Sequence, residues 1–234
     1  MPAFAASSGA GPPLVIAHRG ASAYEVENSL AAFRAAIELG ADGIELDVHA
    51  TADAVFVVHH DPAIAEQPIQ RTAYSALRTV RLPNGEPLPT LAGALDAIGD
   101  AAQVFMEVKA LDPGLDGALL LALDRGPAPS NYHVHSFDHR IVKRLKTKRG
   151  SLSSGVLSAS YVMEPAAQLA QTGAGVLWQH ESLVDGELVD AIHGAKGRVF
   201  AWTVDDPARI EELAHLGADA VCTNRPDVAR GVLR

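Results

Sequence analysis

Charged side chains recur at a spacing of two residues in two apolar stretches of the chain. Glu45 and Asp47 lie in GIELDV, and Glu107 and Lys109 lie in VFMEVK. Because a strand points alternate side chains to opposite faces, each pair should leave one face of its strand together. Three converging acids beside one lysine would have raised pKa values unless a cation is bound. The spacing therefore predicts one divalent cation held by Glu45, Asp47 and Glu107.

The ligand set of this predicted site contains only carboxylate oxygens. Oxygen ligands favour Mg²⁺, Ca²⁺ or Mn²⁺ over Zn²⁺, and the sequence leaves the choice among these three open. A solvated strand end is the alternative for each acid taken singly. Since three acids share one pattern, a common cation site is favoured over three separate solvated strand ends.

Histidines at the ends of apolar runs are the candidates for proton transfer. His18 follows LVIA, and His59 and His60 follow VFVV. Imidazole titrates near neutral pH, so one ring could take a proton while a second gives one. In a strand His59 and His60 would face opposite ways, so only one of them should enter a site. The remaining histidines are predicted to be structural or surface residues: His49, His133, His135, His139, His180, His193 and His215.

A basic residue follows the first of these histidines. Arg19 offers a planar fork of donors suited to a phosphate group, and Gly20 would let the backbone approach closely. The alternative for Arg19 is a structural ion pair with an acid such as Glu27.

Strand and helix patterns alternate along the chain and must position these residues. Apolar runs typical of strands are followed by amphipathic helical patterns, giving eight pairs in all, with an extra hairpin after the second strand. This alternation favours a single closed (β/α)8 barrel over an open doubly wound sheet. Reactive groups in such a barrel lie at the C-terminal ends of strands. The unusual residues fall there: His18, Glu45, Asp47, Glu107, Lys109 and Trp202.

The length of 234 residues suits one barrel domain, which we place at residues 13–234. Residues 1–12 are predicted to be a flexible tail. Residues 61–89 hold five prolines and weak periodicity, so we expect a small insertion after the second strand. Since it leaves the catalytic face, it should form part of the rim of the site.

Composition limits the partners and the compartment. A net charge of -9 argues against binding a nucleic-acid backbone, although a few local cations could still bind a small anionic substrate. No run is long enough to insert stably in a membrane, and the N-terminus lacks the pattern of a signal peptide. The single cysteine, Cys222, lies in an apolar run and is predicted to be a buried structural thiol. We therefore expect a cytoplasmic protein.

The order of the motifs resembles the glycerophosphodiester phosphodiesterase family. The family pattern is HRG, PENT, GAD-x-IE-x-DV and HD; this chain has HRG at 18–20, ENS at 27–29, GADGIELDV at 40–48 and HD at 60–61. LPTL, MEVK, HSF, AWTVDD and GADAVCTNRPD extend the likeness over nearly the whole chain. The HD motif favours His60 over His59.

The resemblance implies a role for each candidate residue. His18 and His60 would be the general acid and base, while Arg19 and Lys109 would bind the phosphate. Glu45, Asp47 and Glu107 would hold the divalent ion. Trp202 would be an apolar wall against the glycerol part of the substrate, with a barrel-packing role as the alternative. The implied reaction converts a glycerophosphodiester into glycerol 3-phosphate and an alcohol.

The chain departs from the family pattern at a few positions. Val26 replaces proline, Ser29 replaces threonine, Asn224 replaces an aspartate, and the RTT after HD is missing. None of these changes removes a predicted ligand or catalytic histidine. The altered segment after Asp61 leaves open which alcohol is accepted.

Two other functions remain as alternatives. The same pattern resembles lysophospholipase D and sphingomyelinase D relatives, which would need an exposed apolar surface for a lipid tail. Residues 61–89 offer only scattered apolar side chains for this: Ile64, Ile69, Tyr74 and Leu77. A non-catalytic barrel that binds phosphorylated ligands would be expected to lack a histidine or a metal ligand, and this chain retains them all. The oligomeric state is not indicated.

Overall fold

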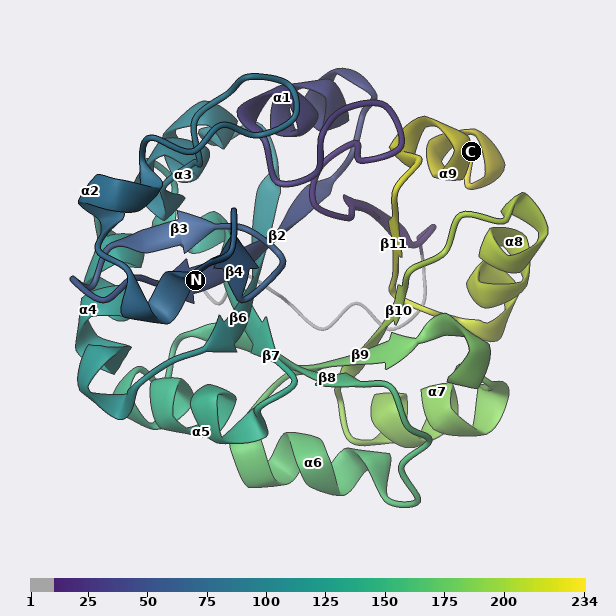
Figure 1. Ribbon diagram of the computed structural model, residues 1–234. Helices are drawn as coiled ribbons and strands as arrows, with labels where there is room; N and C mark the ends of the chain where they lie inside the picture. Colours follow the sequence, from purple (N-terminus) through teal and green to yellow (C-terminus); the bar gives the residue numbers. More distant parts are fainter. Residues whose placement is uncertain (1–10) are drawn as a thin grey trace.

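A closed barrel of parallel strands forms the centre of the computed structural model, which describes residues 11–234 (Figure 1). In order around the barrel the strands are β1 (Leu14–Ala17), β2 (Gly43–Ala50), β6 (Gln103–Ala110), β7 (Tyr132–Ser136), β8 (Ser153–Ser158), β9 (Val176–His180), β10 (Arg198–Trp202) and β11 (Ala220–Thr223). β1 pairs in parallel with both β11 and β2, which closes the ring. The predicted (β/α)8 barrel is confirmed.

Helices surround the barrel and follow its strands in turn (Figure 1). They are α1 (Leu30–Glu38), α3 (Leu91–Ile98), α4 (Asp116–Asp124), α5 (His139–Lys148), α6 (Pro165–Thr172), α7 (Gly186–Gly194), α8 (Pro207–Leu216) and α9 (Pro226–Val232). Local sequence sets several starts: the Thr90 hydroxyl, for example, accepts from the Gly93 N–H at 3.1 Å and caps α3.

The buried face of α1 is narrow. Ala32, Phe33 and Ala36 are buried. Leu30 and Ile37 are only partly buried. They pack at the margin of the apolar layer between helices and strands.

Apolar side chains fill the inside of the barrel. They include Ile16, Phe105, Leu157, Trp178, Phe200, Ala220 and Cys222. Complete burial of a large apolar side chain, such as Ile16 or Phe200, stabilises the fold by about 1.5–3 kcal/mol. Cys222 is a free, buried thiol, and burial raises its pKa well above the usual range, which suits the structural role predicted for it.

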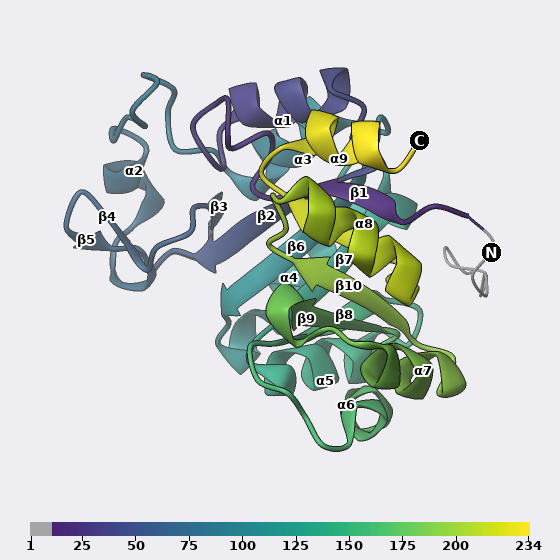
Figure 2. The same ribbon diagram turned by 90° about the vertical axis from the view of Figure 1, so that its right-hand side faces the viewer.

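The segment after β2 leaves the regular repeat. β3 (Phe56–Val58) pairs antiparallel with β2, which confirms the predicted hairpin, and the strand ends at Val58, before His59 and His60. β4 (Ala63–Ile64), β5 (Gln67–Pro68) and α2 (Tyr74–Leu77) follow. Figure 2 shows this segment at the end of the barrel toward which the arrows of β2 and β6 point.

Residues 61–89 pack around a small apolar core with one residue of β3. The core contains Val57 of β3 and Ile64, Ile69, Leu77, Leu82 and Leu88 of the segment. Ile69 and Leu77 are fully buried there. The apolar residues of this segment therefore hold it together and do not offer a surface to a lipid tail.

Two expectations concern the ends of the chain and membranes. The predicted tail, residues 1–12, lies outside the described residues except for its last two positions. Among residues 11–234, no helix combines the length and apolar character needed to cross a membrane.

Candidate active site

Three buried carboxylates meet at the C-terminal ends of β2 and β6. Asp47 stands directly opposite Glu107 in the parallel pairing of these strands, and Glu45 lies two residues before Asp47 on the same face. One oxygen from each carboxylate lies within 4.8 Å of the others. The structure thus brings together the three acids that the sequence singled out.

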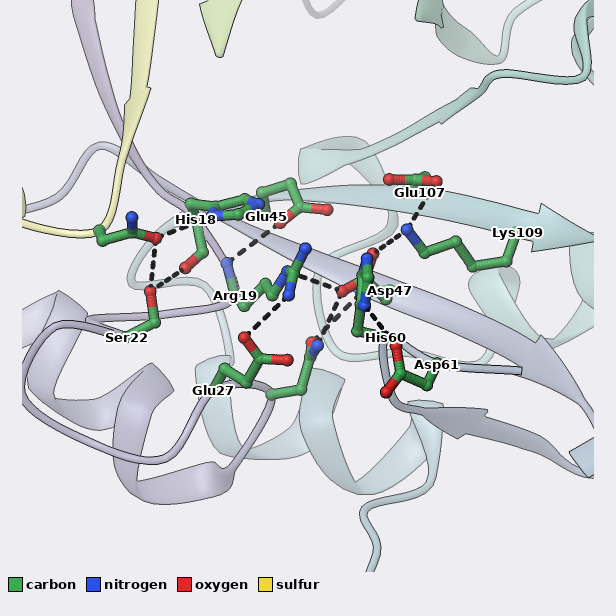
Figure 3. A network of polar contacts seen from close by, with 12 residues as sticks. His18, Arg19, Ser22, Glu27, Glu45, Asp47, His60, Asp61, Glu107 and Lys109 are labelled. Carbon is green, nitrogen blue, oxygen red and sulfur yellow. Dashed lines mark hydrogen bonds and ion pairs between the residues drawn. The ribbon is translucent and has the colours of Figure 1, made fainter. Parts of the chain in front are cut away.

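Two cations contact this cluster (Figure 3). Lys109 Nζ lies 2.9 Å from Asp47 Oδ1 and 2.8 Å from Glu107 Oε1. Arg19 Nε lies 3.2 Å from Asp47 Oδ2, while its Nη1 donates to Glu27 Oε2 at 2.8 Å. The ion pair with Glu27, left open by the sequence, is therefore present alongside the contact to Asp47.

The pKa values of the three acids diverge because their surroundings differ. Burial raises the pKa of Glu45 well above its usual range, and the charges of Asp47 and Glu107 reinforce the shift. Burial also raises the pKa of Glu107, although Lys109 partly offsets this. Burial alone would raise the pKa of Asp47 too, but Lys109 and Arg19 together hold it below its usual value. Glu45 is thus the acid with the least compensation.

The cluster fits a divalent cation. Three negative charges face the two positive charges of Lys109 and Arg19, and only oxygen atoms converge. Hard cations such as Mg²⁺, Ca²⁺ and Mn²⁺ prefer such a ligand set. A cation there would supply the attraction that Glu45 lacks, since its carboxylate accepts from the neutral backbone N–H of Arg19, 3.0 Å from Oε2, and pairs with no Lys or Arg side chain among the described residues.

A chain of hydrogen bonds fixes the ring of His18. Asn224 Nδ2 donates to Asp205 Oδ2, so Asn224 Oδ1 faces His18 Nδ1 at 2.8 Å. The Ser22 hydroxyl lies 2.8 Å from the same oxygen. This network makes Nδ1 the protonated nitrogen of neutral His18 and leaves Nε2 for proton transfer. Burial and the charge of Arg19 lower the pKa of His18.

His60 lines a cleft beside Lys109. Its Nδ1 lies 2.8 Å from Asp61 Oδ1, which orients the ring. Strand alternation does not separate His59 from His60 as predicted, because β3 ends before both residues. The His59 backbone N–H instead donates to the Asp47 carbonyl at 3.0 Å, which ties the strand end to the acidic cluster.

The loop after β1 holds Asp47 in place through Asn28. Asn28 Nδ2 donates to Asp47 Oδ2 at 2.8 Å, and Asn28 Oδ1 accepts from the Asp47 backbone N–H at 3.2 Å. Asn28 and Arg19 both adopt positive φ angles, 57° and 56°, and the Asn28 N–H donates to the Arg19 carbonyl. Asparagine tolerates this conformation better than most residues.

Gly20 has a packing role that the sequence did not indicate. Its φ is 83°, and a Cβ at this position would lie 2.7 Å from Ala32 of α1. Glycine is therefore required where the loop packs against the helix, independently of any phosphate.

Several residues of the site were not assigned a role from the sequence. Asn28, Asp205, Asn224 and Glu86 make their contacts across long stretches of chain. The Glu86 carboxylate accepts from the backbone N–H groups of Leu30 and Ala31 at 2.9 and 3.2 Å, so the insertion stabilises the N-terminus of α1. Asn28, Asp205 and Asn224 carried a signal, since they lie in the ENS, AWTVDD and GADAVCTNRPD motifs, whereas Glu86 carried none.

His135 is structural, as expected, although it borders the cluster. Its ring stacks on Trp178 at a centroid distance of 4.2 Å, and its Nε2 lies 3.9 Å from Glu45 Oε1. Burial lowers its pKa to about 3, so the ring is neutral and forms no ion pair.

Trp202 lies at the end of β10 and is partly buried against the inner core. Its ring makes edge contacts with Phe137 and His180 at centroid distances of 5.4 and 5.3 Å. The packing role left open for this residue is therefore real, while part of the ring stays accessible at the barrel mouth.

Comparison with known proteins identifies the family. A sequence model of the glycerophosphoryl diester phosphodiesterase family matches residues 18–228. The chain belongs to the glycerophosphoryl diester phosphodiesterase family. The resemblance drawn from the motifs, and with it the prediction of a phosphodiester hydrolase, is confirmed at this level.

Individual proteins match this chain along almost their whole length. A glycerophosphodiester phosphodiesterase from Caldanaerobacter subterraneus is 31% identical, with 94% of this chain and 98% of the relative covered. The crystal structure of a glycerophosphodiester phosphodiesterase from Parabacteroides distasonis has a TM-score of 0.86 at 28% identity, covering 96% and 98% of the two chains. An Oleispira antarctica phosphodiesterase, solved with the product sn-glycerol-3-phosphate, shares the fold with a TM-score of 0.87 at 24% identity, covering 94% and 96%.

Proposed function

We propose that the protein is a metal-dependent glycerophosphodiester phosphodiesterase that releases glycerol 3-phosphate and an alcohol. The observation that carries this proposal is the buried cluster of Glu45, Asp47 and Glu107 beside Lys109 and Arg19. A cluster of this kind attracts a cation and presents basic groups to an anion at the same place. Its position in a member of this family points to the phosphodiester as that anion.

Glu45, Asp47 and Glu107 would hold one divalent cation. When bound, that cation would act as a Lewis acid toward a phosphate oxygen and the glycerol hydroxyl. Lys109 would then be released in part from its two carboxylate partners and could donate to the phosphate. Arg19, 17% exposed, could turn its guanidinium from Glu27 to the same group.

His18 and His60 would move the protons. Cleavage of a diester needs a proton taken from the attacking oxygen, which belongs to water or to the neighbouring glycerol hydroxyl, and another given to the leaving oxygen. His18 would act through Nε2, because Asn224 engages Nδ1. His60 would act through the nitrogen that Asp61 does not contact.

A lipid substrate is the second candidate, and one observation favours it. Large apolar side chains are exposed on the loops after β7 and β8: Phe137 is 47%, Tyr161 38% and Met163 88% exposed. Phe137 contacts Trp202, so this surface begins at the barrel mouth. Of the insertion residues considered for this role from the sequence, Ile64, Ile69 and Leu77 are buried and Tyr74 is partly buried against them.

The test is a panel of glycerophosphodiesters and lysophospholipids, with and without a chelator, with products identified by ³¹P NMR. We expect glycerol 3-phosphate from the water-soluble diesters and loss of turnover in the chelator. A product other than glycerol 3-phosphate, or turnover of lysophospholipids alone, would overturn the preferred substrate. Full activity in excess chelator would overturn the metal requirement.

A further inference from the structure

A cleft of about 490 Å³ separates the insertion from the ends of β2 and β6. On the barrel side it is lined by His49, His60 and Lys109, and on the insertion side by Pro68, Gln70 and Arg71. It therefore begins at two residues of the proposed site and ends on a segment outside the barrel. A substrate that places its phosphate near His60 and Lys109 could extend one arm into this cleft.

Arg71 brings a positive charge to this cleft. Asp61, an acid that lines the same cleft, is 2.8 Å from His60 Nδ1, and the structure describes no ion pair of Arg71. Lys109 is engaged by Asp47 and Glu107. The outer part of the cleft therefore offers a cation whose charge no described acid neutralises at close range.

The backbone that carries Arg71 is firmly held. Arg71 ends the 3-10 turn Ile69–Arg71, whose first residue is fully buried in the small core of the insertion. The Ile69 N–H donates to the Pro62 carbonyl at 2.9 Å, and the Ala52 N–H donates to the Thr72 carbonyl at 3.1 Å. Because this backbone is already ordered, little backbone entropy is lost when the Arg71 side chain binds a ligand.

The cleft is unsuited to a cationic alcohol such as choline. Quaternary ammonium groups are recognised by the faces of aromatic rings, and among its described lining residues there is no Phe, Tyr or Trp. The exposed aromatic residues Phe137 and Tyr161 follow β7 and β8 instead.

We propose that Gln70 and Arg71 form the subsite for the leaving alcohol and select an alcohol that carries an anionic group. This inference rests on the proposed phosphodiesterase function. The arginine would pair with the anionic group through its fork of donors, and the Gln70 amide would hydrogen-bond to it.

The experiment compares two substrates that differ by one carboxylate. Glycerophosphoserine is glycerophosphoethanolamine with a carboxylate added, so the ratio of their kcat/KM values measures recognition of that group. We expect the wild-type ratio to favour the serine ester by roughly tenfold, the effect of one charge-assisted hydrogen bond. In Arg71→Gln the ratio should fall to about one, and Arg71→Lys should retain part of it.

Arg78→Gln is the matched control. It removes the same charge from the same insertion, and Arg78 is exposed and does not line the cleft. It should keep the wild-type ratio. A wild-type ratio of one or less, a ratio unchanged in Arg71→Gln, or a loss shared equally by both esters would overturn the subsite. Absence of turnover on every glycerophosphodiester would instead overturn the proposed function itself.

Discussion

Asn28 forms two hydrogen bonds with Asp47. Its side-chain N–H donates to the Asp47 carboxylate at 2.8 Å, and its side-chain oxygen accepts from the Asp47 backbone N–H at 3.2 Å. The two residues come from the loop after β1 and from β2, so this pair fixes one to the other. Lys109 and Arg19 contact the same carboxylate from other directions. Asp47 is thereby oriented before any ligand binds.

Replacing Asn28 should therefore weaken activity without unfolding the barrel. Asn28→Asp substitutes a repelling oxygen for the donor, and kcat/KM should fall by roughly 10- to 100-fold, the usual effect of losing a group that orients a metal ligand. Asn28→Gly keeps the positive φ at no cost but loses both contacts, so it should be similarly impaired. An active Asn28→Asp protein would show that the pair does not orient Asp47 for catalysis.

The histidines give the second prediction. His18→Ala and His60→Ala should each lower kcat by roughly 10²- to 10⁴-fold while the metal content stays that of the wild type. The double variant should fall well short of the product of the two effects, because the residues act as a unit.

His59→Ala is the control for this pair. The contact of His59 with Asp47 is made by its backbone N–H, which the substitution keeps. Its activity should stay close to that of the wild type. If His59→Ala is the damaging change and His60→Ala the mild one, the proton-transfer role belongs to His59.

The Asn224 network predicts a change in pH dependence. The neutral amide beside His18 leaves burial and Arg19 to lower the pKa of this imidazole. Moving the acid next to it, in the double variant Asn224→Asp with Asp205→Asn, should favour the imidazolium and raise that pKa. The limb of the kcat/KM profile that His18 sets, measured from pH 5 to 9, should move to higher pH. If neither limb of the profile moves, the protonation of His18 sets neither of them.

The raised pKa of Glu45 leads to a prediction of how the stability of the metal-free protein depends on pH. Its pKa in the folded protein is raised, by burial first and then by its acidic neighbours. In the unfolded chain the Glu45 carboxyl ionises at about pH 4.3. Because its pKa is higher in the folded protein, its contribution to stability is complete below the unfolded pKa and is lost as the pH rises through the folded pKa. In a chelator, Glu45→Gln should therefore raise Tm relative to the wild type more at pH 8 than at pH 5.

With a divalent cation in excess, the same comparison should change sign. The wild type gains stability from the bound ion, and Glu45→Gln loses most of that gain. Equal Tm differences at pH 5 and pH 8 in the chelator would mean that Glu45 ionises normally in the folded protein.

Sequence patterns were sufficient to predict the barrel and the face of each strand on which its charged residues lie. Strand geometry alone places Glu45 and Asp47 on one face, and likewise Glu107 and Lys109, and the apolar run VFMEVK lies within β6. Each of these side chains is placed by its own strand, so local pattern and barrel topology decide its direction.

Contacts between distant loops could not be predicted in the same way. His18 and Asn224 meet because β1 and β11 are neighbours in the closed barrel, although they are 206 residues apart. Glu86 reaches α1 only because the insertion folds back over the helix start, and irregular backbone has no period from which to read this. For the same reason the strand alternation applied to His59 and His60 failed beyond Val58.

The stoichiometry of metal-dependent activity tests the central claim most directly. Protein stripped with a chelator is titrated with Mg²⁺, Mn²⁺ or Ca²⁺, and release of glycerol 3-phosphate is followed alongside the bound metal. We predict that turnover returns with one equivalent of bound ion, and that Glu45→Gln and Glu107→Gln neither bind that equivalent tightly nor regain activity. Full turnover of the stripped protein, or tight binding of one ion and restored activity in both variants, would contradict the assignment of the carboxylate cluster as the catalytic metal site.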